Sequence, residues 1–278
     1  MLTYIVDARV KYTPKVWNFH SGEVGVNIAY DTEYDKRSVV LIYASINSSD
    51  EVMQLLMLTD ALRRQYYNAD IDLVLSYVPY ARQDRVCNPG DSLSIAVFAK
   101  LINAQNYRKV LAFDTHSYVT DALIDRLTVA PQVEVFNDCF LKQIPVADRD
   151  MILAPDAGAM KKTEAIFKSR GAFKEISFAN KTRDMKTGHI TSISFDADVK
   201  GKSIVIVDDI IDGGATFIGL AAELRARGAK KLTLCVTHGI FTKGHEAIVN
   251  TFDAVYTTNS YHQDRIGEID GVVYCEVI

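Results

Sequence analysis

The segment best suited to chemistry is acidic and glycine-rich. An apolar run, Ser203–Val207, is followed by Asp208 and Asp209, and then by Asp212-Gly213-Gly214-Ala215-Thr216. This order predicts a buried strand that ends in acids, then a glycine turn that opens a helix. Free N–H groups at a helix N-terminus suit a phosphate, and the carboxylates can bind sugar hydroxyls directly or through Mg²⁺. A plain turn with solvated acids is the alternative, but the combination favours a binding site.

This segment resembles the phosphoribosyl-diphosphate binding loop shared by type I phosphoribosyltransferases and ribose-phosphate diphosphokinases. Two other segments favour the diphosphokinases. Tyr77-Val78-Pro79-Tyr80-Ala81-Arg82-Gln83-Asp84-Arg85 looks like their ATP-site segment, which the transferases lack. Phe19-His20-Ser21-Gly22-Glu23 is similar to their Phe-x-Asp-Gly-Glu, which contributes to the nucleotide site of an adjacent subunit. By this resemblance the chain is identified as a member of the diphosphokinase family.

Three more motifs follow in the family's order. Asp114-Thr115-His116 stands where the family has Asp-Leu-His, Pro155-Asp156-Ala157-Gly158 matches its diphosphate-side loop, and Lys181-Thr182-Arg183 matches its catalytic Lys-x-Arg. Taken alone, a histidine after a strand is usually a core or capping residue, Pro-Asp-Ala-Gly is a turn, and the polar run Asn180–His189 is a solvated loop. Only the resemblance gives these residues a function.

The resemblance implies a role for each matched residue. His116 and Asp156 would place Mg²⁺, the implied cofactor, while Lys181 and Arg183 would be catalytic and stabilise the transferring group. ATP would be bound by Phe19, Ser21, Gly22, Glu23, Arg82 and Gln83. The ribose phosphate would be bound by Arg183, Asp208, Asp209, Asp212, Gly213, Gly214, Ala215 and Thr216.

The implied reaction is attack by the 1-hydroxyl of ribose 5-phosphate on the β-phosphorus of Mg-ATP, giving 5-phosphoribosyl 1-diphosphate and AMP. In such phosphoryl transfers the protein mainly aligns the reactants and neutralises charge. Because Phe19–Glu23 would complete a neighbour's nucleotide site, a homo-oligomer of at least two chains is also implied, and we expect it in the cytoplasm.

Three departures from the family pattern leave the acceptor open. Ser21 replaces an aspartate, the stretch Val86–Asp91 lacks the family's basic residues, and the phosphate loop has Gly213 where a threonine is usual and Ala215 where a bare glycine is expected. The missing threonine would leave room for a 5-substituted ribose phosphate such as ADP-ribose. A non-catalytic, nucleotide-binding regulatory relative is a further alternative, disfavoured because the catalytic motifs are retained.

Composition excludes several other classes. The 278 residues carry 31 Lys and Arg against 35 Asp and Glu, so a chain-wide nucleic-acid footprint is not expected. The apolar runs are too short to span a bilayer, which predicts no membrane partner, and the N-terminus lacks the features of a signal peptide. The four cysteines form no Cys-x-x-Cys pair and are interpreted as reduced thiols.

The elements that must position these motifs have an α/β pattern. Strands are expected at 38–46, 71–78, 109–113, 151–154, 203–207 and 231–236, and helices at 50–66 (with Asp50 as N-cap), 93–104, 159–168 and 215–227. Several strand segments are apolar almost throughout, as strands of a parallel sheet covered on both faces must be. We expect two phosphoribosyltransferase-like domains, 1–140 with the ATP site and 141–278 with the ribose-phosphate site.

Overall fold

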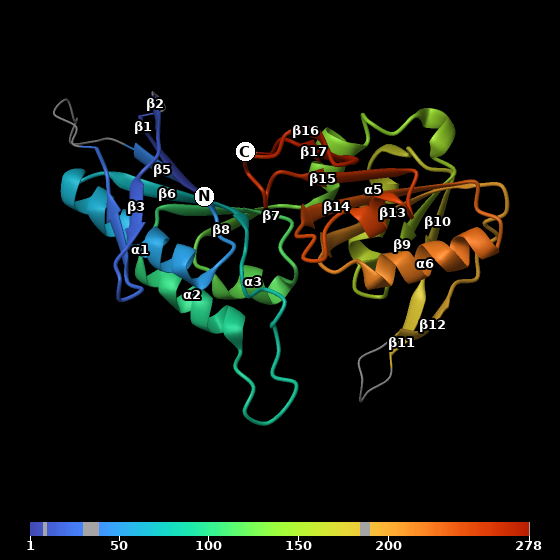
Figure 1. The fold of residues 1–278 in the computed structure, drawn as a ribbon, viewed down its shortest axis with the longest axis horizontal. Helices are drawn as coiled ribbons and strands as arrows, with labels where there is room; N and C mark the ends of the chain where they lie inside the picture. Colours follow the sequence, from blue (N-terminus) through green and yellow to red (C-terminus); the bar gives the residue numbers. More distant parts are fainter. Residues whose placement is uncertain (8–9, 30–38, 184–189, 278) are drawn as a thin grey trace. The chain divides into compact units, whose positions relative to one another are not determined.

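A computed structural model describes residues 1–7, 10–29, 39–183 and 190–277. The chain divides into two compact units, Met1–Ala130 and Pro131–Val277. Each unit is a mainly parallel sheet flanked by helices, as the sequence predicts (Figure 1). Among the helices of the described residues, none has both the length and the apolar character needed to cross a membrane.

The first unit contains a six-stranded sheet in the order β2-β1-β5-β6-β7-β8. Its last four strands are parallel, and β1 runs antiparallel to both of its neighbours. A separate hairpin, β3–β4, contacts α1. The elements are β1 (Leu2–Val6), β2 (Val10–Tyr12), β3 (Lys15–Asn18), β4 (Val24–Asn27), β5 (Val39–Ser45), α1 (Ser49–Gln65), β6 (Asp70–Tyr77), α2 (Ser94–Ala104), β7 (Lys109–Phe113), α3 (Tyr118–Leu123) and β8 (Leu127–Ala130).

The core of this unit forms where α1 and α2 cover the sheet. Leu55, Leu58 and Leu62 of α1 recur at helical spacing and are fully buried with Ile42 of β5 and Phe98 of α2. The predicted N-cap of α1 was wrong by two residues. The Ser48 hydroxyl, not Asp50, accepts the capping hydrogen bond, from the N–H of Glu51 at 3.2 Å.

The second unit contains a seven-stranded sheet in the order β10-β9-β13-β14-β15-β17-β16, in which only β16 is antiparallel to its neighbour. A separate hairpin joins β11 and β12. The strands are β9 (Met151–Ala154), β10 (Glu175–Phe178), β11 (Asn180–Arg183), β12 (Ile190–Ser194), β13 (Ser203–Ile211), β14 (Lys231–Gly239), β15 (Ala254–Thr258), β16 (Gly267–Ile269) and β17 (Val272–Cys275). The helices are α4 (Gln132–Val135), η1 (Phe136–Phe140, one π turn), η2 (Val146–Asp148), α5 (Met160–Arg170), α6 (Ala215–Ala226) and α7 (Glu246–Val249).

Strand β13 lies inside this sheet, between β9 and β14. Its first five residues are all buried, and Leu220 and Leu224 of α6 pack in the same cluster as Ile204 and Ile206. Its length differs from the prediction, because β13 continues through the acids to Ile211 and keeps parallel pairing with β14 as far as Gly239.

The segment 131–140 belongs to the second unit by its contacts. Phe136 and Phe140 are buried there, and the Phe136 ring lies 6.0 Å from that of Phe173. The chain therefore divides after Ala130, ten residues before the expected 140/141 boundary (140 − 130). The composition of this stretch did not predict that Phe136 and Phe140 are buried in the second unit.

All four cysteines are free thiols, as the sequence predicts. Burial raises the pKa of Cys235 well above its usual value and that of Cys275 to about 12. Since the thiolate is the reactive form, these two thiols are inert at neutral pH.

Candidate functional site

The acids of β13 lie at the carboxyl end of the second sheet, where ligands bind in open α/β folds. Burial and the neighbouring carboxylates of Asp209 and Asp156 raise the pKa of Asp208 well above its usual value. Asp209 is only 7% exposed, and its Oδ2 is 3.2 Å from Nζ of Lys162 on α5. Three carboxylates and one ammonium group thus gather at the ends of β9 and β13.

Asp156 follows β9 in a turn that leads toward α5. Its Oδ1 accepts hydrogen bonds from the N–H groups of Gly158, at 2.9 Å, and Ala159, at 3.2 Å. The turn predicted from Pro-Asp-Ala-Gly is therefore present, and the aspartate caps its own loop. Asp156 also lies close enough to Asp208 to raise its pKa, so both acids face one small region.

These residues fit a magnesium ion that retains several water molecules as ligands. Mg²⁺ is usually held by one or two carboxylates, with substrate phosphates and waters supplying the other oxygens. Asp208 and Asp156 form such a group, and a cation between them would favour the ionised form of Asp208. In the described part of the chain, no three His, Cys, Asp or Glu side chains are grouped to hold a metal ion by themselves. His116, the other expected ligand, belongs to the first unit.

The predicted phosphate loop connects β13 to α6. Gly214 is the N-cap of α6 and has φ of +77°, and a Cβ there would lie 2.5 Å from Cδ1 of Ile248. Glycine is therefore required at 214 by both backbone and space. Ala215 is the first helical residue and is exposed, so its methyl group is accommodated.

The chain after β14 is fastened to this loop. Thr242 donates a hydrogen bond of 2.5 Å from its hydroxyl to Oδ1 of Asp212. A Cβ on Gly213 would lie 3.4 Å from Cε of Lys243. The space expected from the missing threonine is therefore bordered by a lysine side chain from another part of the chain.

Lys181 and Arg183 lie on a hairpin rather than in a loop. The backbone of 180–183 forms β11 and pairs antiparallel with β12, with an irregularity between Thr182 and Arg183. Residues 184–189 of the expected loop lie outside the described residues. The polar composition therefore did not prevent antiparallel pairing of this segment with β12.

In the first unit, the ATP-site segment and the His116 turn meet. The chain 78–85 follows β6 and the chain 114–117 follows β7, and these two strands are parallel neighbours. Partial burial raises the pKa of Asp84, but the hydrogen bond from Arg85, with Ser117 and His116 nearby, holds it below its ordinary value. The ion pair between Arg85 and Asp84 is 3.1 Å long.

Arg82, Gln83 and His116 have exposed side chains at this end of the first sheet. Gln83 accepts a hydrogen bond from the hydroxyl of Ser94, the first residue of α2. Tyr80, which precedes them, has a φ of +63° and shares a 2.8 Å hydrogen bond with Ser49. The backbone is thus left-handed at Tyr80, two residues before the exposed Arg82.

The nucleotide segment forms the tip of the β3–β4 hairpin. The N–H of Phe19 donates to the carbonyl of Glu23 at 2.7 Å, and Gly22 has φ of +90°. Ser21 donates to the Glu23 carboxylate at 2.8 Å. Phe19 is 51% exposed and lies edge-on to Trp17. The four expected nucleotide residues therefore share one exposed tip.

Sequence reasoning missed Lys162 and Lys243. A signal existed for Lys162, because it lies in the first turn of α5, where the helix dipole disfavours a cation. A lysine there implies a nearby acid, which the structure identifies as Asp209. Lys243 has no comparable signal, since its contact with Gly213 spans thirty positions (243 − 213).

Comparison with known proteins agrees with this geometry. Residues 9–105 match the profile of the N-terminal domain of ribose phosphate pyrophosphokinase, and residues 182–267 match that of the phosphoribosyl synthetase-associated domain. A ribose-phosphate pyrophosphokinase of Thermococcus kodakarensis is 33% identical over 214 residues, which cover 76% of this chain and 73% of that protein. One of Campylobacter jejuni is 32% identical over 241 residues, covering 84% and 74%.

A solved structure gives the fold. The phosphoribosylpyrophosphate synthetase of Mycobacterium smegmatis superposes with a TM-score of 0.78 at 23% identity, over 95% of this chain and 86% of that one. Sequence identity above 30% over most of the chain assigns the family. The protein belongs to the ribose-phosphate pyrophosphokinase family of enzymes.

Proposed function

We propose that this protein transfers the β,γ-diphosphoryl group of ATP to the 1-hydroxyl of ribose 5-phosphate. A bond forms between the sugar oxygen and the β-phosphorus, the bond from that phosphorus to the α-phosphate oxygen breaks, and AMP leaves. The hydroxyl proton passes to solvent. The observation that carries the proposal is the carboxylate group at the end of β13, directly followed by a loop that opens α6.

The ribose would lie along this segment. Asp208 and Asp209 would accept hydrogen bonds from its hydroxyls, and Asp212–Thr216 would surround its 5-phosphate. The first N–H groups of α6 have no partners within the helix, and its N-cap, Gly214, has no side chain to satisfy them. These donors are therefore available to the phosphate.

ATP would lie against the first unit. Arg82 has the planar fork that suits polyphosphate, and Gln83 can hydrogen-bond a base or a phosphate. Phe19, Ser21, Gly22 and Glu23 would complete the site of a neighbouring chain, which makes a homo-oligomer part of the proposal.

Mg²⁺ would be held by Asp156 and His116, with Asp208 as the neighbouring carboxylate, and it would neutralise charge on the diphosphate. Lys181 and Arg183 would stabilise the transferring group, where donors aimed at developing charge matter most. Arg183 would also bind the ribose phosphate.

A 5-substituted acceptor such as ADP-ribose has less support than before. Such an acceptor needs room beside Gly213, and Cε of Lys243 lies 3.4 Å from the position of a Cβ there. The end of a lysine side chain can move, so ADP-ribose stays a second candidate for the test.

The test is to incubate the protein with Mg-ATP and either ribose 5-phosphate or ADP-ribose, and to identify products by mass. We expect 5-phosphoribosyl 1-diphosphate and AMP in equal amounts from the first mixture. Product from ADP-ribose alone would replace the acceptor. ATP binding without product from either mixture would support the non-catalytic alternative.

A further inference from the structure

Lys243 lies beside the position at which the phosphate loop lacks a side chain. An ideal Cβ on Gly213 would lie 3.4 Å from Cε, 3.5 Å from Cδ and 3.8 Å from Cγ of Lys243. Three consecutive carbons of the lysine therefore line the space beside Gly213, at van der Waals distance from where a Cβ would stand. The backbone of Gly213 does not have positive φ, so conformation alone does not require glycine there.

The backbone that precedes Lys243 is hydrogen-bonded to the end of β13, and the adjacent Thr242 side chain is bonded to the loop. The N–H groups of Ile240 and Phe241 donate to the carbonyl of Ile211 at 2.9 and 3.4 Å, and the Thr242 hydroxyl donates to Asp212. After Lys243, the N–H of Gly244 donates to the carbonyl of Phe241 at 2.9 Å. Lys243 is therefore held beside the phosphate loop by a closed turn.

The charge of Lys243 is not used within the described part of the chain, where it forms no ion pair. Its ammonium group lies near the N-terminus of α6, a position at which the helix dipole disfavours a cation. The nearest acid of the loop, Asp212, already accepts from Thr242. An anion bound at the loop would relieve this repulsion and would be the natural partner of the ammonium group.

We propose that Lys243 is a specificity-determining residue that binds the 5-phosphate of the acceptor and replaces the hydroxyl missing at Gly213. This inference rests on the proposed function and deepens it. Lys243 adds a positive charge where a threonine would add a neutral donor, so it favours a phosphomonoester over a phosphodiester. The chain thereby selects ribose 5-phosphate against ADP-ribose, whose 5-phosphate carries one charge less and needs the space over Gly213.

The test compares Lys243→Met, which keeps an unbranched stem and removes the charge, with Lys200→Met. Lys200 is a matched control because its Cγ lies 3.4 Å from the Cβ position of Gly228, at the other end of α6. The readouts are KM and kcat for ribose 5-phosphate, KM for ATP, and calorimetric titration with ribose 5-phosphate in the absence of ATP.

We expect Lys243→Met to raise KM and Kd for ribose 5-phosphate by about tenfold, the lower end for a lost charge-assisted hydrogen bond. The kcat and the KM for ATP should stay within about twofold, and Lys200→Met should match the wild type. Adding Gly213→Thr to Lys243→Met should recover part of the affinity, because the threonine supplies a hydroxyl donor to the phosphate.

Equal ribose 5-phosphate affinity in Lys243→Met and the wild type would overturn the inference, as would an equal loss in Lys200→Met. If the wild type turns over ribose 5-phosphate and Lys243→Met does so with unchanged KM, only the role of Lys243 fails. If the wild type neither binds nor turns over ribose 5-phosphate, the proposed function fails as well.

Discussion

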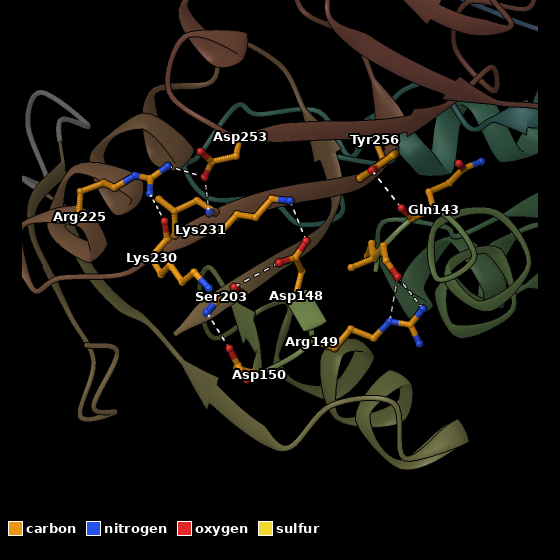
Figure 2. Close-up of polar contacts among 12 residues, drawn as sticks. Gln143, Asp148, Arg149, Asp150, Ser203, Arg225, Lys230, Lys231, Asp253 and Tyr256 are labelled. Atoms are coloured by element: carbon orange, nitrogen blue, oxygen red, sulfur yellow. Dashed lines mark hydrogen bonds and ion pairs between the residues drawn. The ribbon is translucent and has the colours of Figure 1, made fainter. Parts of the chain in front are cut away.

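The acidic side chains at the two edges of the second sheet have opposite surroundings. At the amino edge, where β9, β13 and β14 begin, Asp148 lies 2.7 Å from Lys231 (Figure 2). Asp150 lies 2.7 Å from Lys174. Asp150 also accepts the N–H of Ser203 at 3.0 Å. The hydrogen bond from Lys174, with that from Ser203, holds the pKa of Asp150 below its ordinary value.

At the carboxyl edge the acids face one another. Asp208 has a raised pKa because it is buried beside Asp209 and Asp156, and Lys162 pairs with Asp209. Neighbouring carboxylates destabilise the protein without ligand, and such clusters are typical of a site that binds a cation or a polar ligand. The acids of the amino edge therefore stabilise the fold, whereas those of the carboxyl edge are suited to bind a ligand.

The strongest test replaces two lysines, Lys181 of the β11–β12 hairpin and Lys174, the partner of Asp150 at the amino edge. Lys181→Ala should lower turnover by roughly two to three decades, the scale for losing one donor aimed at developing charge, with little change in ATP binding. Lys174→Ala, at the amino edge, should leave turnover unchanged. Steady-state kinetics of both variants measure this, and near-normal turnover in Lys181→Ala would remove that residue from the catalytic group.

Asp208→Asn should separate activity from stability. We expect a ten- to hundredfold loss of ribose 5-phosphate affinity, because a hydrogen bond to a charged group contributes about 1.5–3 kcal/mol. The Tm in metal-free buffer should rise, since one of three neighbouring carboxylates is removed. Calorimetry of ligand binding and thermal melts measure the two effects; a fall in Tm would place Asp208 among the stabilising acids.

Asp150→Ala should behave in the opposite way. It leaves the N–H of buried Ser203 without its carboxylate, which costs about 1–3 kcal/mol of unfolding free energy. Turnover at a temperature where the variant is folded should match the wild type. Urea unfolding and kinetics test this, and a large loss of turnover in the folded variant would contradict the division between the edges.

The smallest expected effect is a pH dependence. Because the folded-state pKa of Asp150 is depressed, its contribution to stability is fully present above its unfolded pKa of about 3.9. This contribution is lost as the pH falls through the folded-state pKa. The stability difference between the wild type and Asp150→Asn should therefore shrink in urea unfolding from pH 6 to pH 3. A difference that grows toward low pH would reverse the sign of the argument.

The sequence predicted the motif-bearing strands well, because each is a continuous local pattern. Met151–Ala154 forms β9 with the expected bounds, and Lys109–Phe113 forms β7. Strand ends were less predictable. The β13 ladder continues through Asp208 and Asp209 because β14 supplies partners for that length, which hydropathy along one strand does not reveal.

Local order in the chain therefore determined the α/β fold, the acidic strand end and the glycine turn before α6, since each depends on residues a few positions apart. Only the tertiary structure decided which charges meet. In the folded chain Lys162 pairs with Asp209, Asp156 accepts a hydrogen bond from its own loop, and Lys243 lies beside Gly213. These contacts depend on which strands lie side by side and on how the turns after β9 and β14 close, and side chains brought together in this way leave no periodic trace in the sequence.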